Sequence, residues 1–267
     1  RRLTTRYKSL RRPSRFSQAD TLCLFVGHVK SGGSLIGALL DAHPDALVSD
    51  EADVLRYVKA GFGRDQIFHI LEKGSHREAM KGRVTARRLD PYSLAVPGMF
   101  QGRAEQVRLI GDVRAGPTTR QLGERPELLA ALERTVAPTR LRFIHVIRNP
   151  FDPISAMVRR GNRTFENATD DYADQCRRVI DIRAALPADA LLAVRYETFR
   201  ADPAGELGAI CRFLGLRTPA SYLETCASIV DDTRPGERTS VDWSESSIEA
   251  VDRLIASIPF LEGYRWE

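Results

Sequence analysis

Long apolar runs are absent from this 267-residue chain, and the residues that usually hold metals or form disulfides are few. No run approaches the ~18 apolar residues of a membrane-spanning helix, so the sequence predicts none. The four cysteines show neither C-x-x-C pairing nor metal-finger spacing, and the five histidines form no ligand pattern. We therefore expect no bound metal and reduced structural thiols, with a disulfide between Cys211 and Cys226 left open.

Basic charge is concentrated at the start of the chain. Residues 1–19 contain seven basic residues and no acidic one, which exceeds the net charge of +5 for the whole chain. Such an arm can contact nucleic acid or an anionic membrane. No aromatic interleaving or nucleic-acid motif accompanies it, so we expect a solvated or helical leader and no nucleic-acid partner. Contact with a membrane is left open for this arm alone. No signal peptide is visible, which favours a cytoplasmic protein, but the start at Arg1 leaves a removed N-terminal anchor or signal open.

The rest of the chain has the composition of a globular protein, 43% hydrophobic and 28% charged. Short, mostly continuous apolar runs predict buried parallel strands at Leu22–Gly27, Val107–Gly111, Arg142–Ile147 and Leu191–Tyr196. Helical patterns separate or follow them at Ser34–Ala42, Pro126–Thr135, Pro153–Arg160, Tyr172–Leu186, Asp202–Leu214 and Ser244–Ser257. This alternation predicts an α/β fold with a doubly wound parallel sheet. We expect a basic arm over residues 1–20, one domain over 21–267, and an irregular insertion or helical cap over 61–106.

A phosphate-binding loop is predicted where the first strand meets the first helix. Residues 27–34 (GHVKSGGS) lie there, and a helix N-terminus offers unpaired N–H groups and a positive dipole end to an anion. Gly32 and Gly33 would let the backbone approach phosphate oxygens closely. The loop almost matches the Walker A pattern, but Gly33 occupies the position of the lysine that an NTPase requires. The cation is Lys30 instead, and a glycine-rich turn with a chance lysine is the alternative.

A second anion site is predicted after the strand that ends at Ile147. Arg148 would lie at the carboxyl end of this strand, and its guanidinium can donate two hydrogen bonds to a phosphate. Ser155, on the first turns of the next helix, can donate a third. Two anion sites on neighbouring turns would suit a nucleotide with phosphates at both ends of its ribose. The alternative is that Arg148 caps the strand or pairs with Asp152.

These motifs resemble, in kind and in order, those of sulfotransferases that use PAPS (3′-phosphoadenosine 5′-phosphosulfate). Residues 29–44 (VKSGGSLIGALLDAHP) are similar to the family's 5′-phosphosulfate loop, and Phe143–Ser155 is similar to its 3′-phosphate motif. Residues 195–216 resemble its Y-E…D-P…F-L-G-L block, and residues 243–264 resemble its C-terminal ending. The style of the motifs is nearest to tyrosylprotein-type and bacterial enzymes. The resemblance implies a P-loop NTPase-like three-layer sandwich and sulfuryl transfer from PAPS to an acceptor hydroxyl or amine, with PAP as the product and no metal.

The resemblance also implies roles for individual residues. Lys30 would stabilise the leaving phosphate, and Glu51, at the spacing of the base in tyrosylprotein sulfotransferases, would remove the acceptor proton, with Asp50 as a neighbour that could serve instead. Arg238 or Arg234 would close over the 3′-phosphate. The expected cofactor-binding residues are Lys30, Ser31, Gly32, Gly33, Ser34, Arg148, Ser155 and Arg238.

Three departures from the family pattern keep other functions open. Gly33 stands where threonine is usual, Val113 stands where lysine is usual, and Ser155 follows Arg148 by seven residues where many members have eight. Arg114 could substitute for the lysine missing at Val113. The alternatives are a P-loop-type small-molecule kinase, which shares the fold but against which the missing lysine at Gly33 argues, and a nucleotide-binding relative that has lost catalysis, which Gly33 and Val113 suggest.

The acceptor and the oligomeric state stay open at this point. Residues 52–106 are expected to wall the acceptor site, but they carry no strong chemical signature, so the acceptor could be a small molecule, a glycan or a peptide. Four arginines in this stretch would suit an anionic glycan or peptide, although scattered arginines are more often solvated surface: Arg83, Arg87, Arg88 and Arg103.

Overall fold

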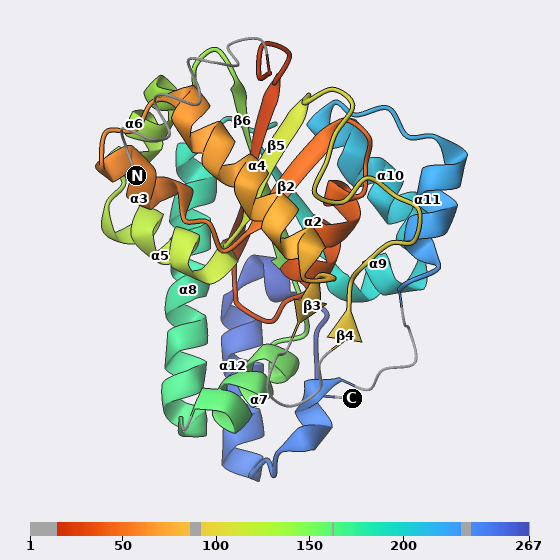
Figure 1. Cartoon of the computed structure of the whole chain (residues 1–267). Helices are drawn as coiled ribbons and strands as arrows, with labels where there is room; N and C mark the ends of the chain where they lie inside the picture. Colours follow the sequence, from red (N-terminus) through yellow and green to blue (C-terminus); the bar gives the residue numbers. More distant parts are fainter. Residues whose placement is uncertain (1–14, 86–91, 162, 231–235, 267) are drawn as a thin grey trace.

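The computed structural model describes residues 15–85, 92–161, 163–230 and 236–266. Its centre is a five-stranded sheet in the order β2-β5-β1-β6-β7, and all neighbouring strands are parallel (Figure 1). These strands are β1 (Thr21–Gly27), β2 (Ala46–Asp50), β5 (Leu109–Val113), β6 (Arg140–Ile147) and β7 (Leu191–Arg195). A small antiparallel pair, β3 (Val84–Thr85) and β4 (Tyr92–Ser93), lies apart from this sheet.

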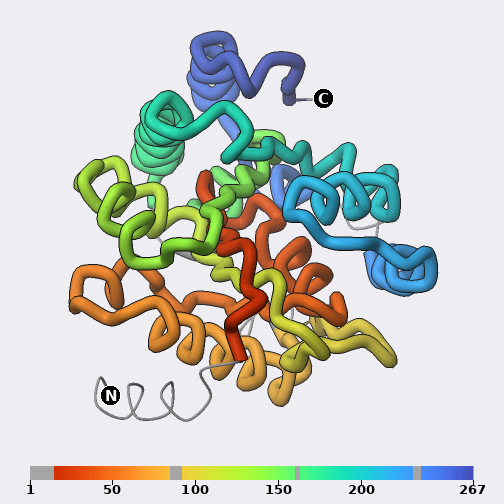
Figure 2. Tube along the Cα trace, turned by 90° about the horizontal axis from the view of Figure 1, so that it is seen from above, coloured from red at the N-terminus to blue at the C-terminus, as the bar shows by residue number. Residues whose placement is uncertain are grey.

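Helices cover both faces of the sheet, as the sequence predicts. Figure 2 shows α5 (Ala115–Glu124) and α6 (Glu127–Val136) on one side of the strands, and α10 (Pro203–Leu214) and α11 (Ala220–Ala227) on the other. Alternate residues of β1 enter separate cores: Leu22, Leu24 and Val26 face the α5 and α6 side, whereas Cys23 and Phe25 face α2 (Gly33–Asp41) and α10. Burial on both faces explains the continuous apolar run in β1.

A third apolar cluster joins three helices that extend together beyond the sheet (Figure 1). They are α7 (Phe151–Gly161), α8 (Phe165–Ala185) and α12 (Glu245–Ser257). Phe151, Tyr172 and Val251 are buried in this cluster. Side-chain caps fix the starts of two of these helices: Thr164 accepts from the N–H of Asn167, and Ser244 accepts from the N–H of Ser247.

The edges of several elements differ from the predicted ones. Strand β5 lies two residues further along than Val107–Gly111, β2 was not predicted, and α8 begins seven residues before Tyr172. The segment 61–106, predicted to be an irregular insertion or a helical cap, contains the 17-residue helix α4 (Arg64–Met80). The caps of α10 are confirmed: the Asp202 side chain accepts from the N–H of Gly205, and Gly215 ends the helix with a φ of 78°.

The remaining short elements connect these parts. Helix α3 (Val54–Lys59) follows β2, and α9 (Tyr196–Ala201) follows β7 directly. Two single turns of 3₁₀ helix, η1 (Glu237–Ser240) and η2 (Pro259–Leu261), flank α12.

A buried polar network attaches α4 to the sheet. Asp41, fully buried at the end of α2, accepts hydrogen bonds from the Ser75 hydroxyl (2.6 Å) and from the N–H groups of Val48 (2.6 Å) and Gly102 (2.8 Å). Arg83 forms an ion pair with Asp41 and donates to the Val48 carbonyl at 2.8 Å. The helical part of the predicted insertion is therefore held by a buried charge with several partners.

Removing one partner of this carboxylate is expected to destabilise the fold. Ser75→Ala should lower the free energy of unfolding by about 1.5–3 kcal/mol, because a hydrogen bond to a buried charged group is lost. Urea denaturation measures the change. His76→Ala is the matched control on an exposed position of α4 and should stay within about 0.5 kcal/mol of the unmodified protein. Equal losses in both variants would contradict a structural role of the network.

The end of the basic arm packs onto the domain, whereas residues 1–14 lie outside the described residues. Phe16 is buried, with its ring 5.7 Å from that of Phe68 in α4, and Arg15 Nε lies 3.0 Å from Glu72 Oε1. All four cysteines are free and buried. No helix in the part of the chain that the structure describes is long and apolar enough to cross a bilayer.

Candidate functional site

The loop between β1 and α2 is shaped to approach an anion. Gly27, Lys30 and Gly32 all have positive φ angles (107°, 66° and 104°), so the chain turns sharply into the N-terminus of α2. A Cβ at Gly32 would collide with the ring of Tyr196, so both the φ angle and the packing favour glycine there. The hydroxyl oxygen of Ser31 is buried and has no hydrogen-bond partner within the described residues. A helix N-terminus with an unsatisfied hydroxyl beside it fits a phosphate or sulfate group.

The loop also leaves space where the resemblance expects a larger residue. A Cβ at Gly33 would lie 3.4 Å from Val113 Cγ1 and 3.5 Å from the ring of Phe25, which are ordinary contacts. The threonine that is usual in sulfotransferases would therefore meet no hard clash through its Cβ.

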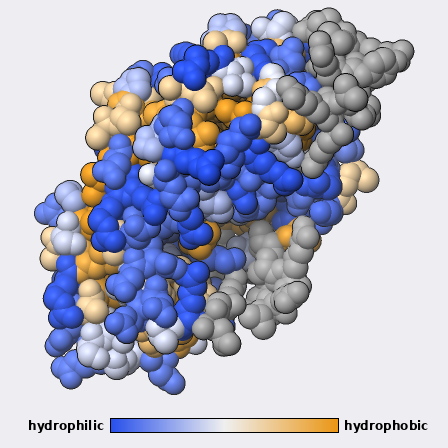
Figure 3. Space-filling view, turned by 90° about the vertical axis from the view of Figure 1, so that its left-hand side faces the viewer, coloured by the Kyte–Doolittle hydropathy of each residue, from blue (hydrophilic) through white to orange (hydrophobic). Residues whose placement is uncertain are grey.

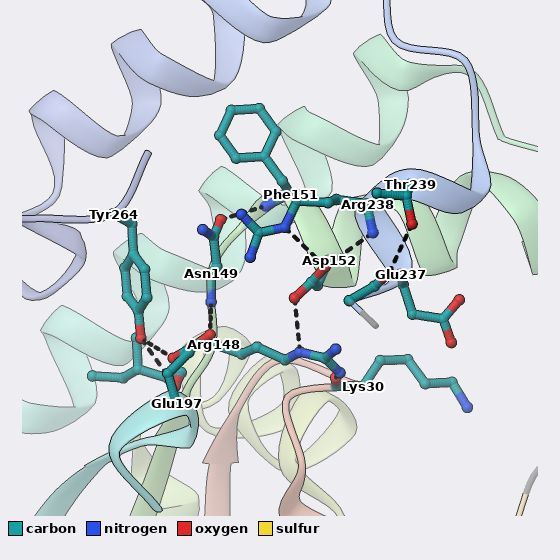
Figure 4. A network of polar contacts seen from close by, with 12 residues as sticks. Lys30, Arg148, Asn149, Phe151, Asp152, Glu197, Glu237, Arg238, Thr239 and Tyr264 are labelled. Carbon is teal, nitrogen blue, oxygen red and sulfur yellow. Dashed lines mark hydrogen bonds and ion pairs between the residues drawn. The ribbon is translucent and has the colours of Figure 1, made fainter. Parts of the chain in front are cut away.

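Arg148 lies directly beside this loop. It follows β6, its Nη1 donates to the carbonyl oxygen of Lys30 at 3.2 Å, and its guanidinium lies 4.8 Å from the centre of the Tyr196 ring. The Lys30 side chain extends away from the guanidinium of Arg148 (Figure 4). The two anion sites predicted from separate motifs are thus adjacent, because β1 and β6 are neighbours and both end at the same edge of the sheet.

An internal carboxylate joins Arg148 to Arg238. Asp152, in the first turn of α7, lies 3.1 Å from Arg148 Nε and accepts the backbone N–H of Arg238 at 2.9 Å and its Nε at 3.4 Å (Figure 4). A Cβ at Gly236 would collide with the same carboxylate, so the turn before η1 docks tightly on α7. The pairing of Arg148 with Asp152, one of the alternatives from sequence, is present. Arg234, the other candidate in this loop, lies outside the described residues.

Ser155 is placed beneath the same loop. Its side chain is fully buried, and its hydroxyl oxygen accepts a hydrogen bond of 3.1 Å from Nε1 of Trp243. Trp243 also donates to the carbonyl oxygen of Arg238, at 3.1 Å. The hydroxyl therefore belongs to the contact between α7 and the η1 loop, and phosphate binding by Ser155 stays a prediction.

Three residues without a predicted role hold the turn after β6. Glu197 accepts the backbone N–H of Asn149 at 2.9 Å and the hydroxyl of Tyr264 at 2.7 Å (Figure 4). The side-chain amide of Asn149 donates to the carbonyl oxygen of Arg265 at 2.8 Å. This network positions Arg148 through its neighbour. The sequence blocks around Glu197 and Tyr264 resemble the family, but only the fold reveals that they meet.

At the other end of the site, Glu51 is held by Arg114. Arg114, which follows β5, places its Nε 3.0 Å from Glu51 and its Nη1 2.9 Å from Asp53. The backbone N–H of Glu51 donates to the Val113 carbonyl at 3.0 Å, and its side chain is 63% exposed. Glu51 is therefore accessible and fixed in direction. Val113 also lies next to Gly33, since a Cβ at Gly33 would be 3.4 Å from Val113 Cγ1. The residue that binds the Glu51 backbone thus also contacts the phosphate-binding loop.

Asp50, the alternative base, has a different environment. It is half-buried at the end of β2. Burial, followed by the nearby negative charge of Glu51, raises the pKa of Asp50 to about 6, and a hydrogen bond from Ser34 opposes the shift. Both acids thus lie at the edge of the sheet, but Asp50 is the more enclosed.

The turn that carries Glu51 is anchored by a buried acid that sequence analysis missed. Asp112, inside β5, accepts the N–H groups of Ala52 and Asp53, both at 2.9 Å, and that of Val54 at 3.4 Å. Burial raises the pKa of Asp112 to about 7, and the three hydrogen bonds oppose this shift. The carboxylate acts as an external cap for the start of α3 and so sets the position of Glu51.

Two cavities open at this edge of the molecule. One, of about 480 Å³, lies beside Glu51, Arg114, α3 and α4. The other, of about 370 Å³, lies between the Lys30 loop and helices α5, α7 and α8. Within the described ranges, no three or more histidine, cysteine, aspartate or glutamate residues are grouped as metal ligands.

Comparisons with known proteins identify a family and similar folds. The model of the sulfotransferase family matches residues 24–220. The sulfotransferase domain of the Synechococcus PCC 7002 olefin synthase has a similar fold, with 17% identity and a TM-score of 0.53 over 89% of this chain and 93% of that chain. Sulfotransferase STF9 from Mycobacterium avium is similar over 97% of this chain and 82% of its own, with 9% identity and a TM-score of 0.56. A comparison with curated proteins gives no match.

Proposed function

Because the chain belongs to the sulfotransferase family, we propose that it transfers the sulfuryl group of PAPS to a hydroxyl or amine of an acceptor. The observation that carries the proposal is the adjacency of two anion-binding elements, with Arg148 Nη1 3.2 Å from the Lys30 carbonyl oxygen. A nucleotide with a 5′-phosphosulfate and a 3′-phosphate requires two such elements side by side.

The loop residues fit the phosphosulfate end. The backbone N–H groups of Ser31, Gly32, Gly33 and Ser34 would bind its oxygens at the start of α2, and the unsatisfied Ser31 hydroxyl could donate to them. When bound, PAPS supplies a sulfuryl group on a phosphate leaving group. Lys30 would supply a positive charge where negative charge develops on that phosphate, and such electrostatic stabilisation is usually the largest part of catalysis.

Arg148, Arg238 and Ser155 are proposed to recognise the 3′-phosphate. Arginine suits a dianion because its planar fork can donate two hydrogen bonds. The Asp152 carboxylate contacts the Nε atoms of both arginines and so holds them near each other, while Arg238 Nη1 donates to the carbonyl oxygen of Trp266 at 2.8 Å. Recognition of the 3′-phosphate would let the protein bind PAP and PAPS in preference to ADP and ATP, which lack this group.

Glu51 is proposed as the general base. It is exposed beside a cavity, and Arg114 fixes its direction. A positioned carboxylate can accept the proton of an attacking hydroxyl. Asp50, with its pKa raised to about 6, is the neighbouring alternative, and substitution separates the two.

Calorimetry with PAP, ADP and ATP tests the donor. We expect PAP to bind without magnesium and more tightly than ADP. Arg148→Ala should weaken PAP binding by roughly 10- to 100-fold, because about 1.5–3 kcal/mol of charge-assisted hydrogen bonding is lost, and should hardly affect ADP.

Arg142→Ala, in the same strand but paired with Asp189, is the matched control and should bind PAP as the unmodified protein does. Magnesium-dependent binding of ATP without binding of PAP would instead indicate a kinase. Transfer of radiolabelled sulfate to an acceptor panel separates an active enzyme from a relative that has lost catalysis.

A further inference from the structure

The cavity of about 480 Å³ beside Glu51 is a candidate binding site for the acceptor, and its lining indicates the chemistry of that acceptor. The turn at 51–53, helices α3 and α4, and Arg114 form its walls. If Glu51 removes the acceptor proton, an acceptor in this cavity presents its hydroxyl to that carboxylate. The inference about the acceptor therefore rests on the proposed role of Glu51 in sulfuryl transfer.

Cationic side chains from three separate elements converge on the cavity. Arg56 comes from α3, Lys73 and Arg77 come from α4, and Arg114 follows β5. The two carboxylates of the lining, Glu51 and Asp53, both pair with Arg114. Four cationic side chains thus stand against two carboxylates in the lining, although Arg77 Nε also lies 3.3 Å from Glu78 outside it. A low-dielectric wall strengthens the field of such a group toward an anion.

A solvated surface is the simpler explanation of charged side chains, and hydrophilic residues predominate on the side of the molecule that carries α3 and α5 (Figure 3). Two arginines that the sequence analysis considered for anion binding do belong elsewhere. Arg83 is buried against Asp41, and Arg103 lies over the ring of Phe100. Arg87 and Arg88 lie outside the described residues. The cationic side chains of the cavity differ from these other arginines because they line a single cavity next to the proposed base, Glu51.

The apolar part of the lining limits the kind of anion. Tyr57 and Ile70, both largely buried, contribute to the wall, and Gly74 lets α4 approach β2 so closely that a Cβ would collide with Ser49. Tyr57 and Ile70 are each 6% exposed, so the apolar surface in the wall is small and lies beside charged groups. A sugar ring, which has small apolar C–H faces and polar edges, suits such a wall. The volume is that of a small-ligand site rather than of an extended groove.

We propose that the acceptor is an acidic saccharide, whose carboxylate or sulfate group is bound by Arg56 and Arg77 while a ring hydroxyl faces Glu51. Arginine fits either anion through its bidentate fork. The base and the anion-binding groups would then select for an acceptor that carries a negative charge as well as the reacting hydroxyl.

The test uses the full chain, radiolabelled PAPS and a matched pair of probes. The probes are the unsulfated disaccharide of glucuronic acid and N-acetylgalactosamine and the same disaccharide with its carboxylate reduced to an alcohol. We expect kcat/KM to be at least tenfold higher for the acidic disaccharide. Arg56→Ala should raise KM for it about tenfold, leave kcat and PAP affinity unchanged, and have no effect on the reduced disaccharide. Arg56→Lys should restore part of the loss.

Lys59→Ala is the control, because Lys59 lies on the same helix and donates to Gln121 outside the cavity lining. The inference is overturned if the reduced disaccharide reacts as well as the acidic one, or if a tyrosine-containing acidic peptide or a neutral phenol is sulfated in its place. Intact PAP binding without transfer to the acidic disaccharide also overturns it and leaves the donor assignment standing. Loss of PAP binding in the unmodified protein would instead remove the proposed function itself.

Discussion

Lys30→Ala is expected to lower kcat for sulfuryl transfer by roughly 10²–10³, the usual cost of removing one group that stabilises charge in the transition state. PAP affinity should change much less, because the backbone N–H groups of the loop remain. The main-chain contact of Lys30 with Arg148 also remains, since it uses the carbonyl oxygen. Single-turnover transfer of radiolabelled sulfate and calorimetry with PAP measure the two effects separately.

The shape of the loop should survive this substitution. Lys30 has a φ of 66°, and alanine pays a similar steric cost there, so thermal unfolding of the variant should match that of the unmodified protein. Lys30→Arg keeps the charge and should recover part of the rate. A turnover of Lys30→Ala within a few-fold of the unmodified enzyme would remove Lys30 from the catalytic step.

Glu51→Gln is expected to reduce kcat by about 10²–10⁴, the range that general-base catalysis contributes. Glutamine has nearly the same shape, can still contact Arg114 through its amide oxygen, and cannot take a proton. The turn should remain in place, because the Asp112 carboxylate holds the N–H groups that follow Glu51. The measurement is the single-turnover rate at saturating acceptor, with PAP affinity as the check on donor binding.

Asp50→Asn is the matched comparison, one residue earlier in the chain. We expect its kcat to fall less than tenfold, because Asp50 is half-buried and lies outside the lining of the acceptor cavity. The reverse pattern, with Asp50→Asn inactive and Glu51→Gln active, would assign the proton transfer to Asp50.

A helix or strand could be predicted from the sequence wherever its local residue pattern matches the burial of its side chains in the fold. Strands β1, β6 and β7 were found because each is an apolar run, and α10 was found because Asp202 and Gly215 mark its two ends. Strand β5 was misplaced because it contains Asp112, whose burial depends on N–H groups about sixty residues away in sequence. Such a partner leaves no local signal.

The same limit applies to α4 and to the details of the site. Helix α4 has a mixed polar pattern, and its attachment through Ser75 depends on Asp41 of another helix. The neighbourhood of Lys30 and Arg148 was predictable, because parallel strands bring their carboxyl ends to one edge. The bridge from Asp152 to Arg238 spans 86 positions, and no spacing rule would identify it.

With Arg148 and Arg238 as the proposed ligands of the 3′-phosphate, the Asp152 carboxylate that they share would make nucleotide binding an exchange of partners. The Asp152 carboxylate already neutralises part of the charge of both guanidiniums. The affinity for phosphate would therefore reflect how much more strongly the arginines bind the phosphate dianion than the Asp152 monoanion. At this proposed site the same difference would lower the cost of releasing the bisphosphate product, because Asp152 can pair again with both arginines. A side chain without any contact to the reacting sulfur would in this way help to set how quickly the enzyme becomes free for its next turnover.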